Sequence, residues 1–284
     1  MDKIVLALQK SQEDKSVAGA SHRQVPEILL EAPEPESLPH KSHTRRYTKA
    51  RGLDEHLVAL HDVNAPATEQ YRRLFVEIIR AGKQRELRTL LISSALSGEG
   101  KTTTALNLAL TIAASGAQRV LLVEMDFRRP NIHSLLGTRP TYGLADYLLG
   151  EVEYSKLLME TQVPGLTVVY AGRPVSSPTT LLRSERMGQF FQKVQSTSGF
   201  PYVILDSSPL LLTSEPSTLI QYADATILVV HARKTPRDVV VKAVEIVKGE
   251  NILGCVFNGI RPSDTNYYYY YYSSEYSYNR NTLY

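Results

Sequence analysis

The stretch TLLISSALSGEGKTT, residues 89–103, decides the fold of this 284-residue chain. It opens on an apolar run, which predicts a buried strand over residues 89–94. A turn with two glycines follows, and the pattern after Lys101 predicts a helix over residues 102–115 that stops before Gly116. Strand, glycine-rich turn and helix, in this order, are the setting in which such a turn binds phosphate groups.

The turn itself supplies the chemistry for that task. Glycines let backbone N–H groups point at phosphate oxygens, and the N-terminus of the following helix adds partial positive charge. We expect Lys101 to reach the β- and γ-phosphates of ATP and Thr102 to bind Mg²⁺ through its hydroxyl. The predicted nucleotide contacts are Gly98, Glu99, Gly100, Lys101, Thr102 and Thr103. Ala95 replaces the first glycine of the common pattern, so a glycine-rich turn with a chance lysine is the alternative.

The rest of the ordered region alternates between strand and helix patterns. Helical spacing of apolar residues predicts helices near residues 66–82, 184–196 and 236–248. Runs rich in Val, Ile and Leu predict strands at residues 120–125, 166–170, 202–206, 225–231 and 252–258. Such runs separated by helices indicate an α/β fold, in which a mostly parallel sheet is covered by helices on both faces.

Two polar segments flank the predicted domain at residues 65–262. Residues 1–64 are expected to be flexible, because scattered prolines and mixed charges leave too little apolar surface for folding. Within them, residues 1–8 are expected to form a frayed local helix, or alternatively an amphipathic helix that docks on a partner or membrane. Residues 41–51 are basic and indicate either a solvated linker or attraction to acidic lipid headgroups.

Composition excludes several classes of protein. A formal charge of +3 gives no electrostatic reason to expect nucleic-acid binding. The single cysteine, Cys255, excludes an intramolecular disulfide and is expected to be a buried thiol, which suits a reducing cytoplasm. No run of about 18 apolar residues is present, so we expect no membrane span.

Carboxylates follow two of the predicted strands. Glu124 and Asp126 end the strand near residue 124, and Asp206 ends another. Ligands of parallel sheets bind at the carboxyl ends of the strands, where these acids could orient Mg²⁺ beside the phosphate loop. The alternative is that each acid only caps the next helix. Asn258 is a weaker candidate for the adenine edge, and His231 is expected to be structural.

The tail at residues 263–284 is dense in phenolic hydroxyls. Its candidate phosphate acceptors are Tyr267, Tyr268, Tyr269, Tyr270, Tyr271, Tyr272, Tyr276, Tyr278 and Tyr284. Together with a nucleotide site, such a tail favours a kinase that phosphorylates itself. Taken alone, the tail could equally be a low-complexity segment that self-associates or binds a partner by stacking.

These segments together resemble the bacterial tyrosine kinases of capsule and exopolysaccharide synthesis, within the P-loop group that includes the MinD and ParA ATPases. Residues 93–103 resemble the family's Walker A segment, residues 124–130 its Walker A′ segment and residues 205–209 its Walker B segment. Residues 171–184 are similar to a further family loop, and the terminal tyrosine cluster is the family's most distinctive mark.

The resemblance implies a function and its parts. It implies an ATP- and Mg²⁺-dependent protein-tyrosine kinase that modifies its own tail and regulates polysaccharide synthesis and export. Catalytic roles would fall on Lys101, Glu124, Asp126 and Asp206, with Glu124 as proton acceptor and with Thr102, Asp126 and Asp206 around the metal. It also implies a separate transmembrane activator, homo-oligomers, an opposing tyrosine phosphatase, and a cytoplasmic location at the inner face of the membrane.

Two departures from the family pattern carry weight, and a third position separates the chain from the MinD and ParA branch. Glu124 stands where the family usually has aspartate, and Phe75 replaces the last arginine of the E-x-x-R-x-x-R pattern begun by Glu69 and Arg72. In the family, that pattern contacts neighbouring subunits in ring-shaped oligomers. Leu96 occupies the position of the MinD and ParA signature lysine, which argues against that branch. The rival functions are a MinD-like ATPase switch that recruits membrane partners, and a regulator that binds nucleotide without turnover.

Overall fold

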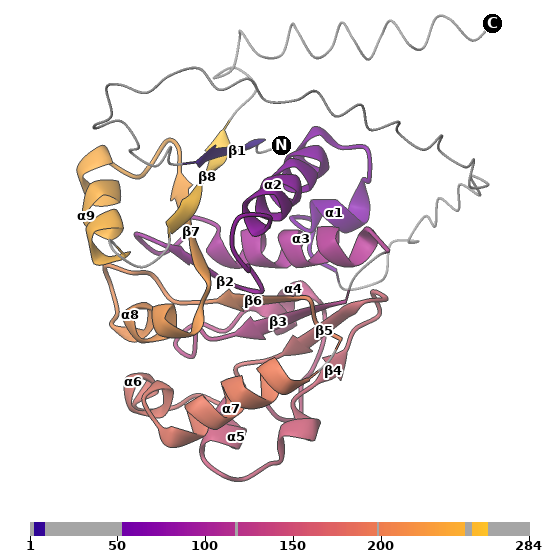
Figure 1. Cartoon of the computed structure of the whole chain (residues 1–284), viewed down its shortest axis with the longest axis vertical. Coiled ribbons are helices and arrows are strands. Elements are labelled where there is room, and N and C mark those ends of the chain that lie inside the picture. Colours follow the sequence, from indigo (N-terminus) through magenta and orange to yellow (C-terminus); the bar gives the residue numbers. More distant parts are fainter. Residues whose placement is uncertain (1–2, 9–52, 117–118, 198, 248–251, 261–284) are drawn as a thin grey trace, which may run out of the picture. The chain divides into compact units, whose positions relative to one another are not determined.

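The centre of the protein is an eight-stranded sheet (Figure 1). The computed structural model describes residues 3–8, 53–116, 119–197, 199–247 and 252–260. Within them the strand order is β1-β8-β7-β2-β6-β3-β5-β4. The strands are β1 (Lys3–Leu8), β2 (Thr89–Ser94), β3 (Val120–Glu124), β4 (Met159–Glu160), β5 (Leu166–Val169), β6 (Tyr202–Asp206), β7 (Ala225–His231) and β8 (Ile252–Ile260). The strands from β8 to β5 in this order are parallel, and the edge strands β1 and β4 are antiparallel to their neighbours.

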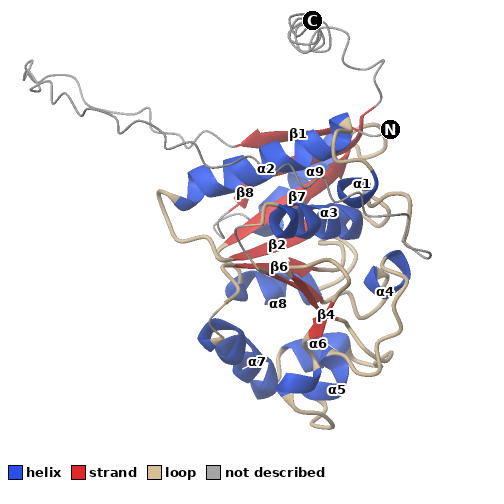
Figure 2. Ribbon diagram, turned by 90° about the vertical axis from the view of Figure 1, so that its right-hand side faces the viewer, coloured by secondary structure: helices blue, strands red, loops and turns tan. Residues whose placement is uncertain are grey.

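Helices cover both faces of the sheet (Figures 1 and 2). One face packs against α1 (Val58–His61), α2 (Pro66–Gly82), α3 (Lys101–Ala114) and α4 (Ile132–Leu135). The other packs against α5 (Leu144–Leu148), α6 (Pro178–Leu182), α7 (Glu185–Ser196), α8 (Glu215–Leu219) and α9 (Arg237–Val247). Two single 3₁₀ turns, η1 (Tyr154–Lys156) and η2 (Ile220–Tyr222), complete the secondary structure of the described residues.

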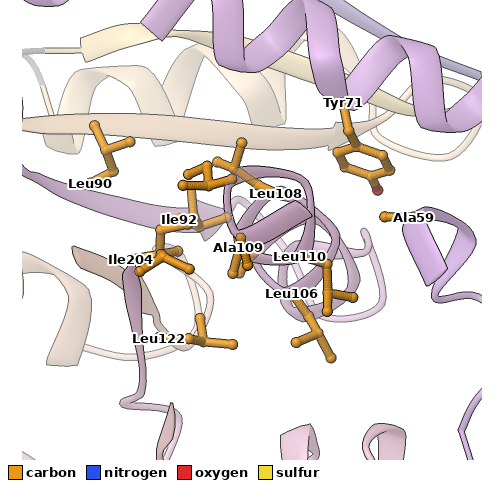
Figure 3. Packing of buried hydrophobic residues seen from close by; sticks show 14 of the residues in the cluster. Ala59, Tyr71, Leu90, Ile92, Leu106, Leu108, Ala109, Leu110, Leu122 and Ile204 are labelled. Atoms are coloured by element: carbon orange, nitrogen blue, oxygen red, sulfur yellow. The ribbon is translucent and has the colours of Figure 1, made fainter. Parts of the chain in front are cut away.

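Helix α3 is the packing centre of the first face. Figure 3 shows Ala109 of this helix beside Ile92 and Ile204 of the central strands, while Leu106 and Leu110 project from another side of the helix. All ten of its residues from Thr104 to Ala113 are buried, which is unusual for a surface helix and typical of one enclosed by sheet and helices together. The enclosure fixes the N-terminus of α3, and with it Lys101, relative to the strand ends.

The register of the parallel strands brings the predicted acids to one edge of the sheet. Glu124 of β3 is the register partner of Asp206 of β6, and Ile92 of β2 is the partner of Asp206 on its other side. The phosphate loop leaves β2 two residues after Ile92. Lys101 therefore begins α3 at the same edge as both acids, as parallel pairing requires.

The predicted α/β fold is confirmed, and each predicted strand and helix of the core is present within one or two residues of its expected bounds. Toward the N-terminus the structure differs more from the prediction. The helix expected at residues 1–8 is wrong, because Lys3–Leu8 pair with β8 as strand β1. Ordered structure also begins before residue 65, with Leu57 fully buried in the core. Cys255 is half-buried rather than buried.

Several predictions concern residues outside the described part. The basic residues 41–51 and the tyrosine tail at residues 263–284 both lie there. Within the described part, none of the helices has the length and apolar character needed to cross a bilayer.

Candidate functional site

The phosphate loop adopts a shape that requires its glycines. Gly98 and Gly100 have φ angles of 81° and 94°, in the left-handed region that residues with a Cβ rarely enter. A Cβ on Gly100 would lie 2.0 Å from Nδ2 of Asn258, whereas one on Gly98 would meet nothing within 4 Å. Gly100 is therefore required for space as well as for conformation. Lys101 follows as the first residue of α3.

Lys101 is held by an acid of the β3 end. Its Nζ lies 3.0 Å from Oδ2 of Asp126 and 3.4 Å from the hydroxyl oxygen of Thr102. The other oxygen of Asp126 accepts hydrogen bonds from the backbone N–H groups of Arg128, at 3.3 Å, and Arg129, at 3.0 Å. Asp126 is thus fully engaged, and its clearest task in this arrangement is to orient Lys101.

Asp206 differs from Asp126 in having unused oxygens. It is 1% exposed, and neither carboxylate oxygen has a hydrogen-bond partner among the described residues. Burial raises the pKa of Asp206 to about 7, against the opposing charge of the nearby Lys101 ammonium. A buried carboxylate without partners is costly unless a cation joins it.

These residues fit a Mg²⁺ ion that arrives with a nucleotide. Mg²⁺ in nucleotide sites keeps several waters and takes one or two protein carboxylates together with substrate phosphates. No cluster of three or more His, Cys, Asp or Glu side chains suited to a metal occurs among the described residues, so a site made by the protein alone is not present there. The free oxygens of Asp206 and the hydroxyl of Thr102 supply what a nucleotide-borne ion needs.

The contacts of Glu124 do not favour its predicted role as proton acceptor. The residue is 1% exposed. Its Oε1 accepts hydrogen bonds from the N–H groups of Asn131, at 2.6 Å, and Ile132, at 2.7 Å, and its Oε2 accepts one from Ala171 at 3.1 Å. Desolvation raises the pKa of Glu124, while these three hydrogen bonds lower it. The longer side chain thereby ties the end of β3 to the start of α4 and to the segment that follows β5.

The side chains of Glu99 and Asn258 serve the loop itself. The Glu99 carboxylate is 3% exposed and accepts hydrogen bonds from the protein rather than facing outward. Asn258, the weaker candidate for the adenine edge, uses its Nδ2 to donate to the backbone oxygen of Glu99 at 2.9 Å. The expected phosphate contacts of Gly98, Glu99 and Gly100 therefore rest on the main chain. Thr103 lies in the first turn of α3, and its carbonyl oxygen accepts a hydrogen bond from Nδ2 of Asn107 at 2.9 Å.

Further polar contacts link the segments that carry Asp126 and Asp206, and sequence patterns do not predict them. Arg128 donates two hydrogen bonds to Glu215, which is 1% exposed and lies 87 positions further along the chain. The hydroxyl groups of Ser208 and Thr213 lie 2.7 Å apart in the loop that joins β6 to α8. The only signal for Glu215 is an acid placed just before a proline, among serine and threonine residues.

Comparison with known proteins places the chain in a family. A family model described as an AAA domain matches residues 87–248, more than half of the chain. The tyrosine-protein kinase CpsD of Streptococcus agalactiae serotype III (strain NEM316) is 31% identical over 207 residues, which cover 72% of this chain and 87% of that protein. The chain belongs to the bacterial tyrosine-protein kinase family.

Two further relatives agree with this placement. The tyrosine-protein kinase YwqD of Bacillus subtilis (strain 168) is 29% identical over 225 residues, covering 78% of this chain and 94% of that one. The kinase domain of the Escherichia coli tyrosine kinase ETK superposes with a TM-score of 0.69 at 28% identity, over 77% of this chain and 85% of that domain. The chain is thus a tyrosine-kinase relative along nearly the whole described core.

Proposed function

We propose that this bacterial tyrosine kinase transfers the γ-phosphate of ATP to tyrosines of its own C-terminal segment, and in this way regulates the synthesis and export of capsule or exopolysaccharide. One observation carries the proposal. Lys101, Asp126 and the partnerless carboxylate of Asp206 converge at the carboxyl edge of the sheet, directly below a glycine loop shaped for phosphate.

Each of these side chains has a definable task. Lys101 neutralises negative charge on the β- and γ-phosphates, and Asp126 keeps its ammonium group in place. Asp206 and Thr102 would hold Mg²⁺, which when bound supplies further charge neutralisation on the phosphates. The carboxylate of Asp206 is set for this by burial without a competing partner.

The reaction conserves atoms in a simple way. A bond forms between the phenol oxygen and the γ-phosphorus, the bond from that phosphorus to the β–γ bridging oxygen breaks to release ADP, and the phenol proton passes to solvent water. A free tyrosine has a pKa near 10 and is a poor nucleophile at neutral pH. Positioning and charge neutralisation dominate phosphoryl transfer, so we assign catalysis to Lys101 and Asp206 and give Glu124 a structural task.

The acceptors are the tail tyrosines. Residues 263–284 follow strand β8 in the chain, and they carry the six consecutive tyrosines 267–272 together with Tyr276, Tyr278 and Tyr284. Many equivalent hydroxyls on one segment tolerate imprecise docking, and each phosphate adds about −1.5 to −2 charges at neutral pH. Repeated labelling would therefore turn the tail into a strongly acidic segment.

The test uses the full chain with MgATP. Anti-phosphotyrosine blotting and peptide mass spectrometry should find label in residues 263–284, and truncation after residue 262 should remove most of it while MgADP binding persists. Lys101→Met should abolish labelling. Lys83→Met, which alters an exposed lysine at the end of α2, is the matched control and should label normally. Phosphotyrosine that persists in purified Lys101→Met protein would refute the assignment.

The rival ATPase switch makes the opposite prediction in the same assay. It requires phosphate release without any phosphotyrosine. Leu96, in the place of the signature lysine of MinD and ParA proteins, and membership of the tyrosine-kinase family both favour the kinase.

The partners are proposed on the family resemblance. We propose a separate transmembrane activator that brings the chain to the inner face of the membrane, a tyrosine phosphatase that reverses the labelling, and a homo-oligomer in which one copy's tail enters another copy's site. Mixing the Lys101→Met chain with an active chain truncated after residue 262 tests the last point, because only transfer between copies can label the inactive one.

A further inference from the structure

The side chain of Glu99 spans the base of the phosphate loop. Its Oε2 accepts a hydrogen bond from the backbone N–H of Leu96 at 2.5 Å, which closes the loop on itself across three residues. Its Oε1 accepts hydrogen bonds from the hydroxyl of Thr235 and from the N–H of His231, the latter at 3.4 Å. Thr235 lies in the turn between β7 and α9, so one carboxylate joins the loop to a different part of the sheet.

The main chain at the same residue is held from strand β8. Nδ2 of Asn258 donates to the carbonyl oxygen of Glu99 at 2.9 Å, and Oδ1 of Asn258 accepts from the N–H of Gly259, also at 2.9 Å. The amide group packs over Gly100 so closely that a Cβ there would overlap it. The backbone of β8 is tied in turn to β7, because the carbonyl oxygen of Asn258 accepts from Ala232 N–H at 2.9 Å.

We propose that Glu99 is a positioning residue, which fixes the phosphate loop in its phosphate-receiving shape and does not itself contact phosphate. Thr235 and Asn258 are the two anchors through which it does so. This inference rests on the proposed binding of ATP at the loop and deepens it, by assigning a different task to a residue inside the motif.

The positioning role of Glu99 follows from the direction of its two carboxylate oxygens, which face the protein. A loop that cradles phosphate must direct several N–H groups at one oxygen cluster, and ordering it only on binding would cost conformational entropy. The buried carboxylate of Glu99 orders the loop beforehand, since its oxygens accept from Leu96 on one side and from Thr235 on the other. A carboxylate turned toward the phosphates would instead repel them.

A carboxylate that orders the loop and one that faces the phosphates predict opposite effects on nucleotide binding, so binding measurements distinguish them. The dissociation constant of MgADP is measured by calorimetry for the wild-type full chain, Glu99→Ala and Glu99→Gln, with Glu86→Ala on the exposed surface as the matched control. Glu99→Ala should weaken binding about tenfold or more, since an unpaired N–H and a loosened loop together cost at least about 1.4 kcal/mol. Glu99→Gln should stay within about threefold of wild type, because its amide oxygen can accept from Leu96 while its NH₂ donates to the Thr235 hydroxyl, and only the long 3.4 Å contact with the His231 N–H is lost.

A second readout follows the loop without nucleotide. The Leu96 amide should be protected from hydrogen exchange in the nucleotide-free wild type and in Glu99→Gln, and should lose that protection in Glu99→Ala. Glu86→Ala should match wild type in both measurements. A role in general stability alone would not concentrate the change at Leu96.

Each remaining outcome has a definite meaning. Tighter MgADP binding by Glu99→Gln would show that the carboxylate faces the phosphates, and unchanged binding by a folded Glu99→Ala would show that it positions nothing; either overturns the inference. Should Glu99→Ala fail to fold, Thr235→Val removes one anchor only and must weaken MgADP binding measurably for the inference to stand. If the wild-type chain itself binds no MgADP, the proposed function fails first.

Discussion

The guanidinium group of Arg128 donates two hydrogen bonds to a single carboxylate oxygen of Glu215, from Nε at 3.0 Å and from Nη2 at 2.8 Å. The pair joins the segment after β3 to the start of α8, and so connects the two strand ends that carry Asp126 and Asp206. Burial raises the pKa of Glu215, but hydrogen bonds from its own backbone N–H and from Arg128, together with the positive charge of that guanidinium, outweigh it and hold the pKa below its usual value.

Removing the arginine should therefore destabilise the protein. Arg128→Met leaves Glu215 buried without its cation, and we expect a loss of about 1–3 kcal/mol in the free energy of unfolding, because an unpaired buried acceptor keeps its desolvation penalty. The double variant Arg128→Met with Glu215→Leu should regain most of that loss. Urea unfolding of the three proteins measures both values.

The pH dependence of this pair has a fixed sign. Since the folded-state pKa of Glu215 lies below the unfolded value of 4.5, the stability it contributes is present above pH 4.5 and is lost as the pH falls through the folded value. The difference between wild type and Arg128→Met should shrink across that acidic range. A difference that grows on acidification would contradict the pairing.

Asp206→Asn should stabilise the nucleotide-free protein while destroying its use of MgATP. The buried carboxylate has no partner, so a neutral amide of the same shape should raise the free energy of unfolding by about 1–3 kcal/mol. Because the folded pKa is about 7 against 3.8 unfolded, the wild type loses stability as the pH rises from about 4 to 7, and the gain should be largest above pH 7. Thermal unfolding at pH 5 and 8, with and without MgADP, checks this.

Glu124→Asp tests whether this residue is structural. Although aspartate is usual at this position in the family, the shorter side chain would withdraw from the N–H groups of Asn131, Ile132 and Ala171. We expect a loss of about 1–3 kcal/mol in unfolding free energy, with little change in the rate of self-labelling at a temperature where the variant is folded. A large fall in that rate with unchanged stability would restore Glu124 as the proton acceptor.

Phe75→Arg, which restores the family's arginine, should weaken the core of this chain. Phe75 is 8% exposed, and its ring meets that of Tyr202 edge-on with centroids 5.4 Å apart. A charged group in that place should cost about 2–4 kcal/mol, whereas Phe75→Leu should cost less because it keeps an apolar side chain of similar size. Chemical denaturation compares the two. Equal stability of Phe75→Arg and wild type would show that this position does not require a buried apolar side chain.

The sequence was a good guide wherever a local pattern determines structure. Apolar runs located the core strands, and the glycines of the loop with the acid at the end of β6 located Lys101 and Asp206 together. It failed where the determining contact is distant. Glu99 meets Thr235 across 136 positions and Arg128 meets Glu215 across 87, and no spacing encodes such pairs. The partners of the Glu124 carboxylate are backbone N–H groups, which leave no mark in the sequence at all.

The two edges of the sheet differ in how readily a further strand could pair with them. At one, the two-residue strand β4 blunts the edge, since so short a strand offers few free backbone groups to an extended chain. At the other, β1 lies along β8, the strand from which the chain continues toward its tyrosines. Strand β1 therefore occupies the backbone hydrogen-bonding groups on the outer side of β8. Loss of β1 would expose that side of β8 to pairing with a strand of another molecule.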